Sequence, residues 1–264
     1  MSFEEATRPV GGSGTWRGEL VAGWDIFGIT NGGYVMAMAT RAMEVESGGR
    51  TLISATGSYV NPATPGPVDL DVEVLKEGRS LSTLRTTVSR DGKDLVYVTA
   101  VYEDAGRPKH QGDVVLASPP ELPEPDECVL AVPAEDGPIP PPFIGMVEMR
   151  AVPEDWESIG VGRSGPIRSR GWLRLKDGES FDAHAVVMAT DAFPPAIFFS
   201  DLGVGWTPTV DLTVQVRDPS PTGWLACQFE TRFITDGLLE EDGEIWDQSG
   251  NLVALSRQLA LVPR

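Results

Sequence analysis

A pair of glycines at the start of a predicted helix offers backbone hydrogen-bond donors to a ligand. Gly32 and Gly33 precede the run VMAMATRAMEVES, in which Met36, Ala39 and Met43 recur at helical spacing. The first N–H groups of a helix have no partner within it, and glycine lets a ligand approach the backbone, so this place can bind an anion. An equally open interpretation is that the glycines only allow close helix packing.

Four polar residues elsewhere have side chains suited to acid–base or hydrogen-bond chemistry. Asp191, in ATDAFPPA, is a candidate base, and Asp is also a favoured helix N-cap. Gln258 lies in an apolar strand-like run, where a glutamine needs a buried partner. Thr209 starts another such run and is also an ordinary strand former. Asp25 is a reserve base or a solvated loop carboxylate.

Metal and nucleic-acid chemistry find little support in the composition. The two histidines, His110 and His184, are far apart, and the two cysteines, Cys128 and Cys227, form neither a metal motif nor a disulfide framework. We expect no metal and no cofactor. The net charge of -18 disfavours nucleic-acid binding. The sequence has no apolar run long enough to predict a membrane span, and its acidic N-terminus lacks the features of a secretory signal. We therefore expect a cytoplasmic protein.

The chain divides around a proline-rich segment, SPPELPEPDECVLAVPAEDGPIPPP, at residues 118–142. Prolines at this density lack N–H donors and restrict φ, so neither a helix nor a central strand is expected there. We therefore expect a semi-extended surface linker over 118–142. It would join an N-terminal domain, 1–117, to a C-terminal domain, 143–264.

Both halves show the same order of predicted elements: lead-in strand, helix, then further strands. The runs VDLDVEVL at 68–75 and VDLTVQV at 210–216 alternate apolar and polar residues, as half-buried strands do. By the same alternation, Thr209 should share a polar face with Asp211 and Thr213. The second helix is expected within 181–200, where Pro194-Pro195 interrupts it.

A unit repeated at half the chain length indicates duplication, and one helix per sheet is not a doubly wound fold. The hairpin tails SRDGKDLVYVTAVYE and IWDQSGNLVALSRQLALV are alike, each with a turn signal before its last strand. We therefore predict an α+β protein of two tandem β-α-β-β-β units. In each unit an antiparallel sheet wraps a central helix.

Several segments in this order resemble the acyl-CoA thioesterase II family, the double-hotdog thioesterases. They are Gly32-Gly33-Tyr34, SYVNPATPGPVDLDVEVLKEGRSLSTLRTTV, ATDAFPPA, TPTVDLTV and GNLVALSRQLALV. The resemblance covers the chain from Trp16 to Val262 apart from the linker. It implies a double hotdog, with the hydrolysis of an acyl-coenzyme A to free fatty acid and coenzyme A, as in fatty acid metabolism.

The resemblance also implies which residues act. An Asp, a Thr and a Gln hold the attacking water in this family, and they match Asp191, Thr209 and Gln258. Gly32 and Gly33 would bind the substrate and its developing oxyanion. The family often has glutamine where this chain has Tyr34, which puts a role for that side chain in doubt.

Two other functions remain open. A hotdog hydratase or dehydratase needs an Asp–His pair, for which His184 is the candidate, and the chain has no Asn-Pro-x-His pattern. A non-catalytic acyl-CoA-binding protein would have lost the Asp-Thr-Gln set.

Candidates to line an acyl tunnel, or simply to fill the core, are Met36, Met38, Met43, Phe193, Ile197 and Phe198. Candidates to contact coenzyme A phosphates are Arg79, Arg85, Arg217, Arg232 and Arg257. A homo-oligomer is possible but not required.

Overall fold

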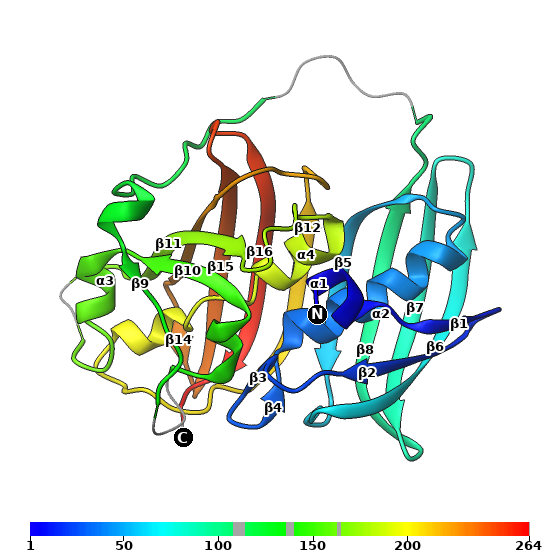
Figure 1. The fold of residues 1–264 in the computed structure, drawn as a ribbon, viewed down its shortest axis with the longest axis horizontal. Helices are drawn as coiled ribbons and strands as arrows, with labels where there is room; N and C mark the ends of the chain where they lie inside the picture. Colours follow the sequence, from blue (N-terminus) through cyan, green and yellow to red (C-terminus); the bar gives the residue numbers. More distant parts are fainter. Residues whose placement is uncertain (108–113, 136–139, 163–164, 264) are drawn as a thin grey trace.

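The computed structural model describes residues 1–107, 114–135, 140–162 and 165–263. Within these ranges one antiparallel sheet of 14 strands has the order β1-β2-β6-β7-β8-β5-β12-β16-β15-β13-β11-β10-β9, with β14 paired to β15. Figure 1 shows this sheet as two curved halves side by side, each with helices against it. The halves meet where β5 pairs with β12.

The N-terminal half wraps the long helix α2 (Gly32–Glu46). Its strands are β1 (Val10–Gly12), β2 (Thr15–Leu20), β5 (Thr51–Tyr59), β6 (Gly66–Glu77), β7 (Leu81–Arg90) and β8 (Lys93–Glu103). Helix α1 (Phe3–Thr7) and the separate hairpin of β3 (Asp25–Ile26) and β4 (Ile29–Thr30) complete it. Asn31 caps α2, because its side-chain oxygen accepts the Tyr34 N–H at 2.8 Å.

The C-terminal half wraps the shorter helix α4 (Ala183–Ala189). Its strands are β9 (Val129–Leu130), β10 (Val147–Ala151), β11 (Ile167–Leu175), β12 (Thr209–Val216), β13 (Leu225–Thr231), β14 (Ile234–Thr235), β15 (Leu238–Asp247) and β16 (Leu252–Leu261). The remaining helices are α3 (Pro153–Glu157) and the 3-10 helices η1 (Pro125–Glu127), η2 (Pro142–Gly145) and η3 (Ala196–Phe199). Helix α4 ends well before Pro194-Pro195, and only η3 follows these prolines.

The two halves share one core. Helix α2 packs against α4, and the contact is close because a Cβ on Gly33 would lie 3.0 Å from the Cα of Met188. At the sheet junction the hydroxyls of Thr56 on β5 and Thr213 on β12 are 3.0 Å apart. A single cluster of buried apolar side chains includes residues of both helices and both half-sheets. The halves are therefore joined through both layers of the structure.

The predicted double hotdog is confirmed, since each half-sheet curves around its own helix (Figure 1). Both alternating runs are strands, β6 and β12. Four sheet strands follow α2, and four follow α4 besides the short β14. The predicted β-α-β-β-β unit has only three strands after its helix, so each half contains one strand more than predicted.

The proline-rich segment 118–142 follows the edge of the C-terminal half over its described residues. The indole N–H of Trp172 donates to the carbonyl of Pro123 at 2.8 Å. Further along, β9 pairs with β10, so part of the segment is a short edge strand. The segment ends at the cavity described below, which Pro140 and Pro141 help to line.

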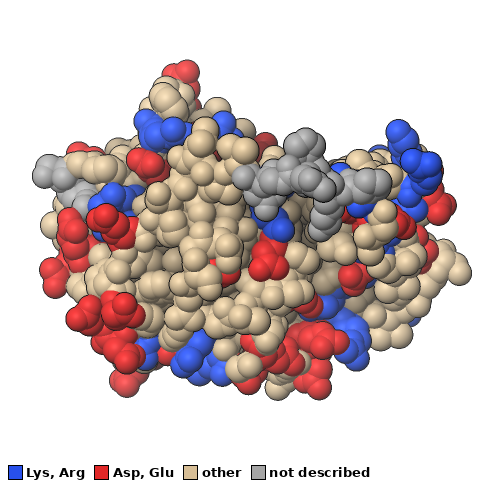
Figure 2. Space-filling model, turned by 90° about the horizontal axis from the view of Figure 1, so that it is seen from above, with Lys and Arg blue, Asp and Glu red and all other residues tan. Residues whose placement is uncertain are grey.

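No helix within the described ranges is long and apolar enough to cross a membrane. Figure 2 shows one face of the molecule, on which acidic and basic side chains lie in small groups around broad uncharged areas. Acidic groups are more numerous in the whole chain, as the net charge of -18 requires.

Candidate active site

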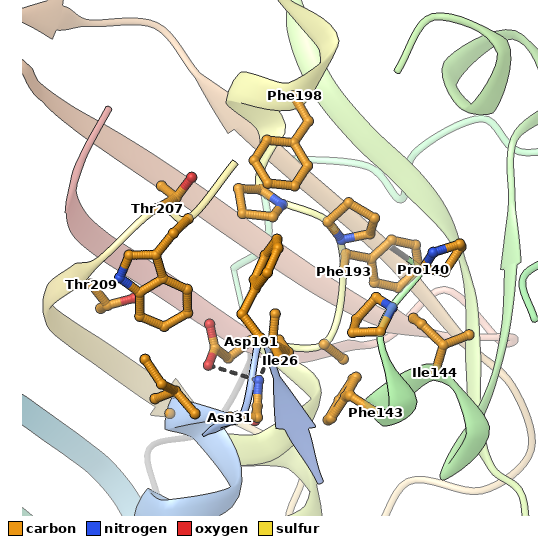
Figure 3. Close-up of a pocket in the computed structure, with 18 of the residues that line it drawn as sticks. Ile26, Asn31, Pro140, Phe143, Ile144, Asp191, Phe193, Phe198, Thr207 and Thr209 are labelled. Carbon is orange, nitrogen blue, oxygen red and sulfur yellow. Dashed lines mark hydrogen bonds between the residues drawn. The ribbon is translucent and has the colours of Figure 1, made fainter. Parts of the chain in front are cut away.

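A cavity of about 320 Å³ lies where loops of the two halves meet around the start of α2. Its walls are mostly apolar and include Phe143, Phe193 and Phe198. Figure 3 shows Asp191 beside Asn31 at the base of this cavity, with Thr209 to one side and the apolar walls opposite. Asp191, Thr209 and Gln258 all line it, although they are far apart in the sequence. The three residues predicted to be catalytic are thus brought to one cavity.

Asp191 joins the end of α4 to the start of α2. It lies in the turn after Thr190, the C-cap of α4, and the Gly33 N–H donates to its Oδ2 at 2.9 Å. Nδ2 of Asn31 donates to the same Oδ2 at 3.0 Å and to the Asp191 carbonyl at 2.7 Å. Asp191 does not cap the helix that follows it, because η3 begins only at Ala196. Instead its carboxylate contacts the first turn of the helix in the other half.

The surroundings of Asp191 make it a stronger base than an ordinary aspartate. Burial raises its pKa from 3.8 to about 6, while hydrogen bonds from the N–H groups of Gly33 and Gly32 and from Asn31 oppose that rise. The carboxylate is therefore mostly ionised at neutral pH and still able to accept a proton. A general base needs this combination of charge and basicity.

Thr209 and Gln258 form a direct pair, in which Nε2 of Gln258 donates to the Thr209 hydroxyl at 2.6 Å. The expectation that Thr209 shares a face with Asp211 and Thr213 is wrong. Opposite β16, Thr209 pairs with Ala260 but Asp211 pairs with Leu259, so β12 contains one extra residue. This bulge reverses the alternation at that point and turns Thr209 to the same face as Gln258.

The predicted oxyanion residues divide into two groups. Gly32 lines the cavity, and Gly33 donates to Asp191. A Cβ on Gly32 would lie 2.7 Å from the Tyr59 hydroxyl and one on Gly33 would lie 2.9 Å from the Cβ of Asp191, so both glycines also permit close packing. The structure supports the packing interpretation, and the binding of an oxyanion by these glycines stays a prediction.

Tyr34 is not brought to the cavity. Its ring stacks on Trp24 with centroids 5.0 Å apart, and its hydroxyl donates to the carbonyl of Ala6 at 2.6 Å. Burial raises the pKa of this hydroxyl to about 12. Asp25 also lies outside the cavity lining, where its Oδ1 accepts the Gly23 N–H at 2.9 Å.

Sequence reasoning missed two buried groups near Asp191. Glu241 lies opposite Gln258 in the pairing of β15 with β16, and its carboxylate accepts the Ala196 N–H. Tyr59 has a buried hydroxyl with no hydrogen-bond partner among the residues that the structure describes. Burial raises the pKa of Tyr59, and the charge of Asp191 adds to that rise. Glu241 lies in the acidic run LLEEDGEIWD of β15, so nothing in the sequence marks it as the buried one among these carboxylates.

His184 cannot act with Asp191 in the arrangement seen here. Its two ring nitrogens lie 2.9 Å from the Thr40 hydroxyl and 3.2 Å from a Glu44 carboxylate oxygen, both on α2. The side chain is buried between the helices and does not line the cavity. Among the described residues, the cavity therefore contains no Asp–His pair of the kind that a hydratase needs. His110 lies outside the described residues.

Only some of the residues predicted to contact the ligand lie at the cavity. Phe193 and Phe198 line the cavity, whereas Met36, Met38 and Met43 belong to the core alone. Among the candidate arginines, Arg85 pairs with Glu73, Arg232 and Arg257 pair with Asp242, and Arg217 donates to Gln215. No lysine or arginine is among the described residues that line the cavity. The cavity can therefore take an uncharged group better than a phosphate.

Two family models match this chain, one for each half. Residues 20–102 match the acyl-CoA thioesterase N-terminal domain, and residues 125–262 match the acyl-CoA thioesterase C-terminal domain. The chain is also similar to the thioesterase-like protein TwmA of Talaromyces wortmannii, with 25% identity over 98% of this chain and 91% of that protein.

Solved structures share the whole fold. A candidate thioesterase II from Thermobifida fusca is 29% identical and superposes with a TM-score of 0.86, covering 100% of this chain and 98% of the other. The acyl-CoA thioesterase II TesB2 of Mycobacterium marinum is 18% identical, with a TM-score of 0.74 over 98% of this chain and 97% of that one. At this lower identity the second likeness concerns the fold alone.

Proposed function

We propose that this chain, which belongs to the acyl-CoA thioesterase family, hydrolyses an acyl-coenzyme A to a free fatty acid and coenzyme A. The observation that carries the proposal is the meeting of Asp191, Thr209 and Gln258 in one apolar cavity. Family membership supports a thioester substrate, and the site offers the base that hydrolysis needs.

In the proposed reaction Asp191 removes a proton from a water molecule, whose oxygen attacks the thioester carbonyl carbon. The Thr209 hydroxyl accepts a hydrogen bond from Gln258, which leaves its own proton free to orient that water. The developing oxyanion lies near the start of α2 and is stabilised there by the positive end of the helix dipole, since the N–H groups of Gly32 and Gly33 already donate to Asp191. When the C–S bond breaks, the proton held by Asp191 passes to the sulfur of coenzyme A.

Replacing Asp191 by Asn tests this proposal. Asn keeps the size of the side chain and an oxygen that can accept the Gly33 N–H, but it cannot take a proton from water. We expect kcat for acyl-coenzyme A hydrolysis to fall about 10²- to 10⁴-fold while acyl-coenzyme A binding persists. The wild-type rate should fall as the pH is lowered through about 6, because Asp191 is then protonated.

Asp25→Asn is the matched control, since Asp25 lies outside the cavity lining and accepts one backbone N–H. This variant should keep the wild-type rate. Normal turnover in Asp191→Asn would show that Asp191 is not the base, and loss in Asp25→Asn would transfer that role to Asp25. A wild-type protein that binds acyl-coenzyme A without hydrolysing it would be a binding protein instead.

A further inference from the structure

The four non-glycine residues with positive φ in the described structure all occupy the same kind of turn. Each is the first residue of a two-residue turn that joins the strands of a β-hairpin, and glycine is the second. The four turns are Ser13-Gly14, Phe27-Gly28, Asp91-Gly92 and Asp236-Gly237, with first φ values of 54°, 53°, 51° and 52°. Asp in particular tolerates this left-handed conformation, whereas a bulky aromatic residue is an outlier there.

Phe27 is thus unfavourable for the backbone conformation of its turn, and its position suggests a functional reason for its presence. The turn joins β3 to β4, directly before the site residues Asn31 and Gly32. Phe27 lines the cavity and is 37% exposed, so its ring lies at the mouth rather than the base. Backbone strain that is kept in a structure occurs most often at functional sites.

The ring of Phe27 meets a second aromatic side chain from the other half. Its centroid is 6.1 Å from that of Trp206, at an interplanar angle of 82°. Trp206 lies in the loop between η3 and β12, three residues before Thr209, and also lines the cavity. The two aromatic rings therefore bridge the halves at the cavity mouth.

Core packing does not explain this pair. The other phenylalanines of the cavity, Phe143, Phe193 and Phe198, belong to the buried core clusters, but neither Phe27 nor Trp206 does. Since no lysine or arginine lines the described cavity, the part of a ligand that contacts these rings is uncharged. In an acyl-coenzyme A the acyl chain suits two apolar rings better than the uncharged pantetheine arm, whose amide groups need hydrogen-bond partners.

We propose that Phe27 and Trp206 are specificity-determining residues, whose rings contact the acyl chain at the cavity mouth and favour longer chains over short ones. This inference rests on the proposed function. Phe27 has an unfavourable backbone conformation in this turn. An aspartate or asparagine would suit the turn better but would remove the aromatic ring that contacts Trp206 and, as proposed, the acyl chain.

The test compares butanoyl- and decanoyl-coenzyme A as substrates of the wild type and Phe27→Asn. Asn suits the turn, so the melting temperature should rise by about 2 to 4 °C. We expect kcat/KM for decanoyl-coenzyme A to fall about tenfold or more, with little change for butanoyl-coenzyme A. Trp206→Leu should alter the same ratio in the same direction. Asp236→Asn, at the equivalent position of a turn outside the cavity lining, should leave the ratio unchanged.

An unchanged ratio in Phe27→Asn, or an equal loss for both substrates, would overturn the inference. Binding of the non-hydrolysable S-butyl- and S-decyl-coenzyme A, measured by calorimetry, separates this outcome from a failure of the proposed function. If the wild type hydrolyses neither thioester, the proposed function fails. The inference then stands only if the wild type prefers the S-decyl analogue and Phe27→Asn loses that preference.

Discussion

Two buried carboxyl groups, those of Asp191 and Glu241, influence each other within the C-terminal half. Burial raises the pKa of Glu241 from 4.5 to about 7, the hydrogen bond from the Ala196 N–H opposes this, and the negative charge of Asp191 adds to the rise. Only Asp191 lines the cavity, and Glu241 lies behind it, opposite Gln258. We therefore expect the ionisation of Asp191 to affect reactivity and that of Glu241 to affect stability.

Glu241→Gln should make the protein more stable at pH 8 and have little effect near pH 4. The folded protein binds the Glu241 proton more tightly than the unfolded chain, so its ionisation costs stability as the pH rises from about 4.5 to about 7. Gln removes that cost and can still accept the Ala196 N–H. We expect a gain of about 2 to 3 kcal/mol at pH 8 in urea unfolding. An equal change at both pH values would contradict this origin.

At the level of elements, alternation predicted β6 and β12, and helical spacing predicted α2, each to within a few residues. They could not predict the turned side chain of Thr209, because one extra residue opposite Ala260 reverses the alternation locally. They also could not predict the bonds between Asn31 and Asp191, which join loops 160 residues apart. Asn31 directly precedes the predicted helix in the sequence, but its bonds to Asp191 depend on the packing of α2 against α4.

The close approach of these two helices predicts that Gly33→Ala will damage both stability and activity. The new Cβ would lie 2.9 Å from the Cβ of Asp191 and 3.0 Å from the Cα of Met188, so α2 must shift away from the turn that contains Asp191. We expect a loss of about 1 to 3 kcal/mol in the free energy of unfolding and a lower kcat. Gly12→Ala is the control, since a Cβ on Gly12 would meet nothing within 4 Å. Wild-type kcat in Gly33→Ala would argue against a fixed Gly33–Asp191 contact.

For the whole molecule, sequence reasoning identified the duplication but not how the copies share a site. The cavity takes Asn31 from one half and Thr209 from the other, and the proline-rich segment adds Pro140 to its wall. Such a site follows from the pairing of β5 with β12, which no local pattern encodes. Under the proposed function, the phosphates of coenzyme A would compete for the arginines with acids such as Asp242, in a chain whose net charge is -18.

The shared core predicts that the two halves unfold together. Leu70 on β6 and Leu225 on β13 are fully buried, and both belong to the core cluster that spans the halves. Each Leu→Ala substitution should lower the stability by about 2 to 5 kcal/mol, because it removes buried apolar surface and leaves a cavity. Since the halves also share the β5–β12 pairing, either substitution should move one common transition rather than part of it.

Urea unfolding followed by circular dichroism and by tryptophan fluorescence measures this coupling. The two probes should give coincident curves for the wild type, for Leu70→Ala and for Leu225→Ala. If the halves were independent, Leu70→Ala would instead produce two transitions, one of them at the wild-type midpoint. Because the cavity is built from both halves, that result would also mean that the site can be lost while half of the protein stays folded.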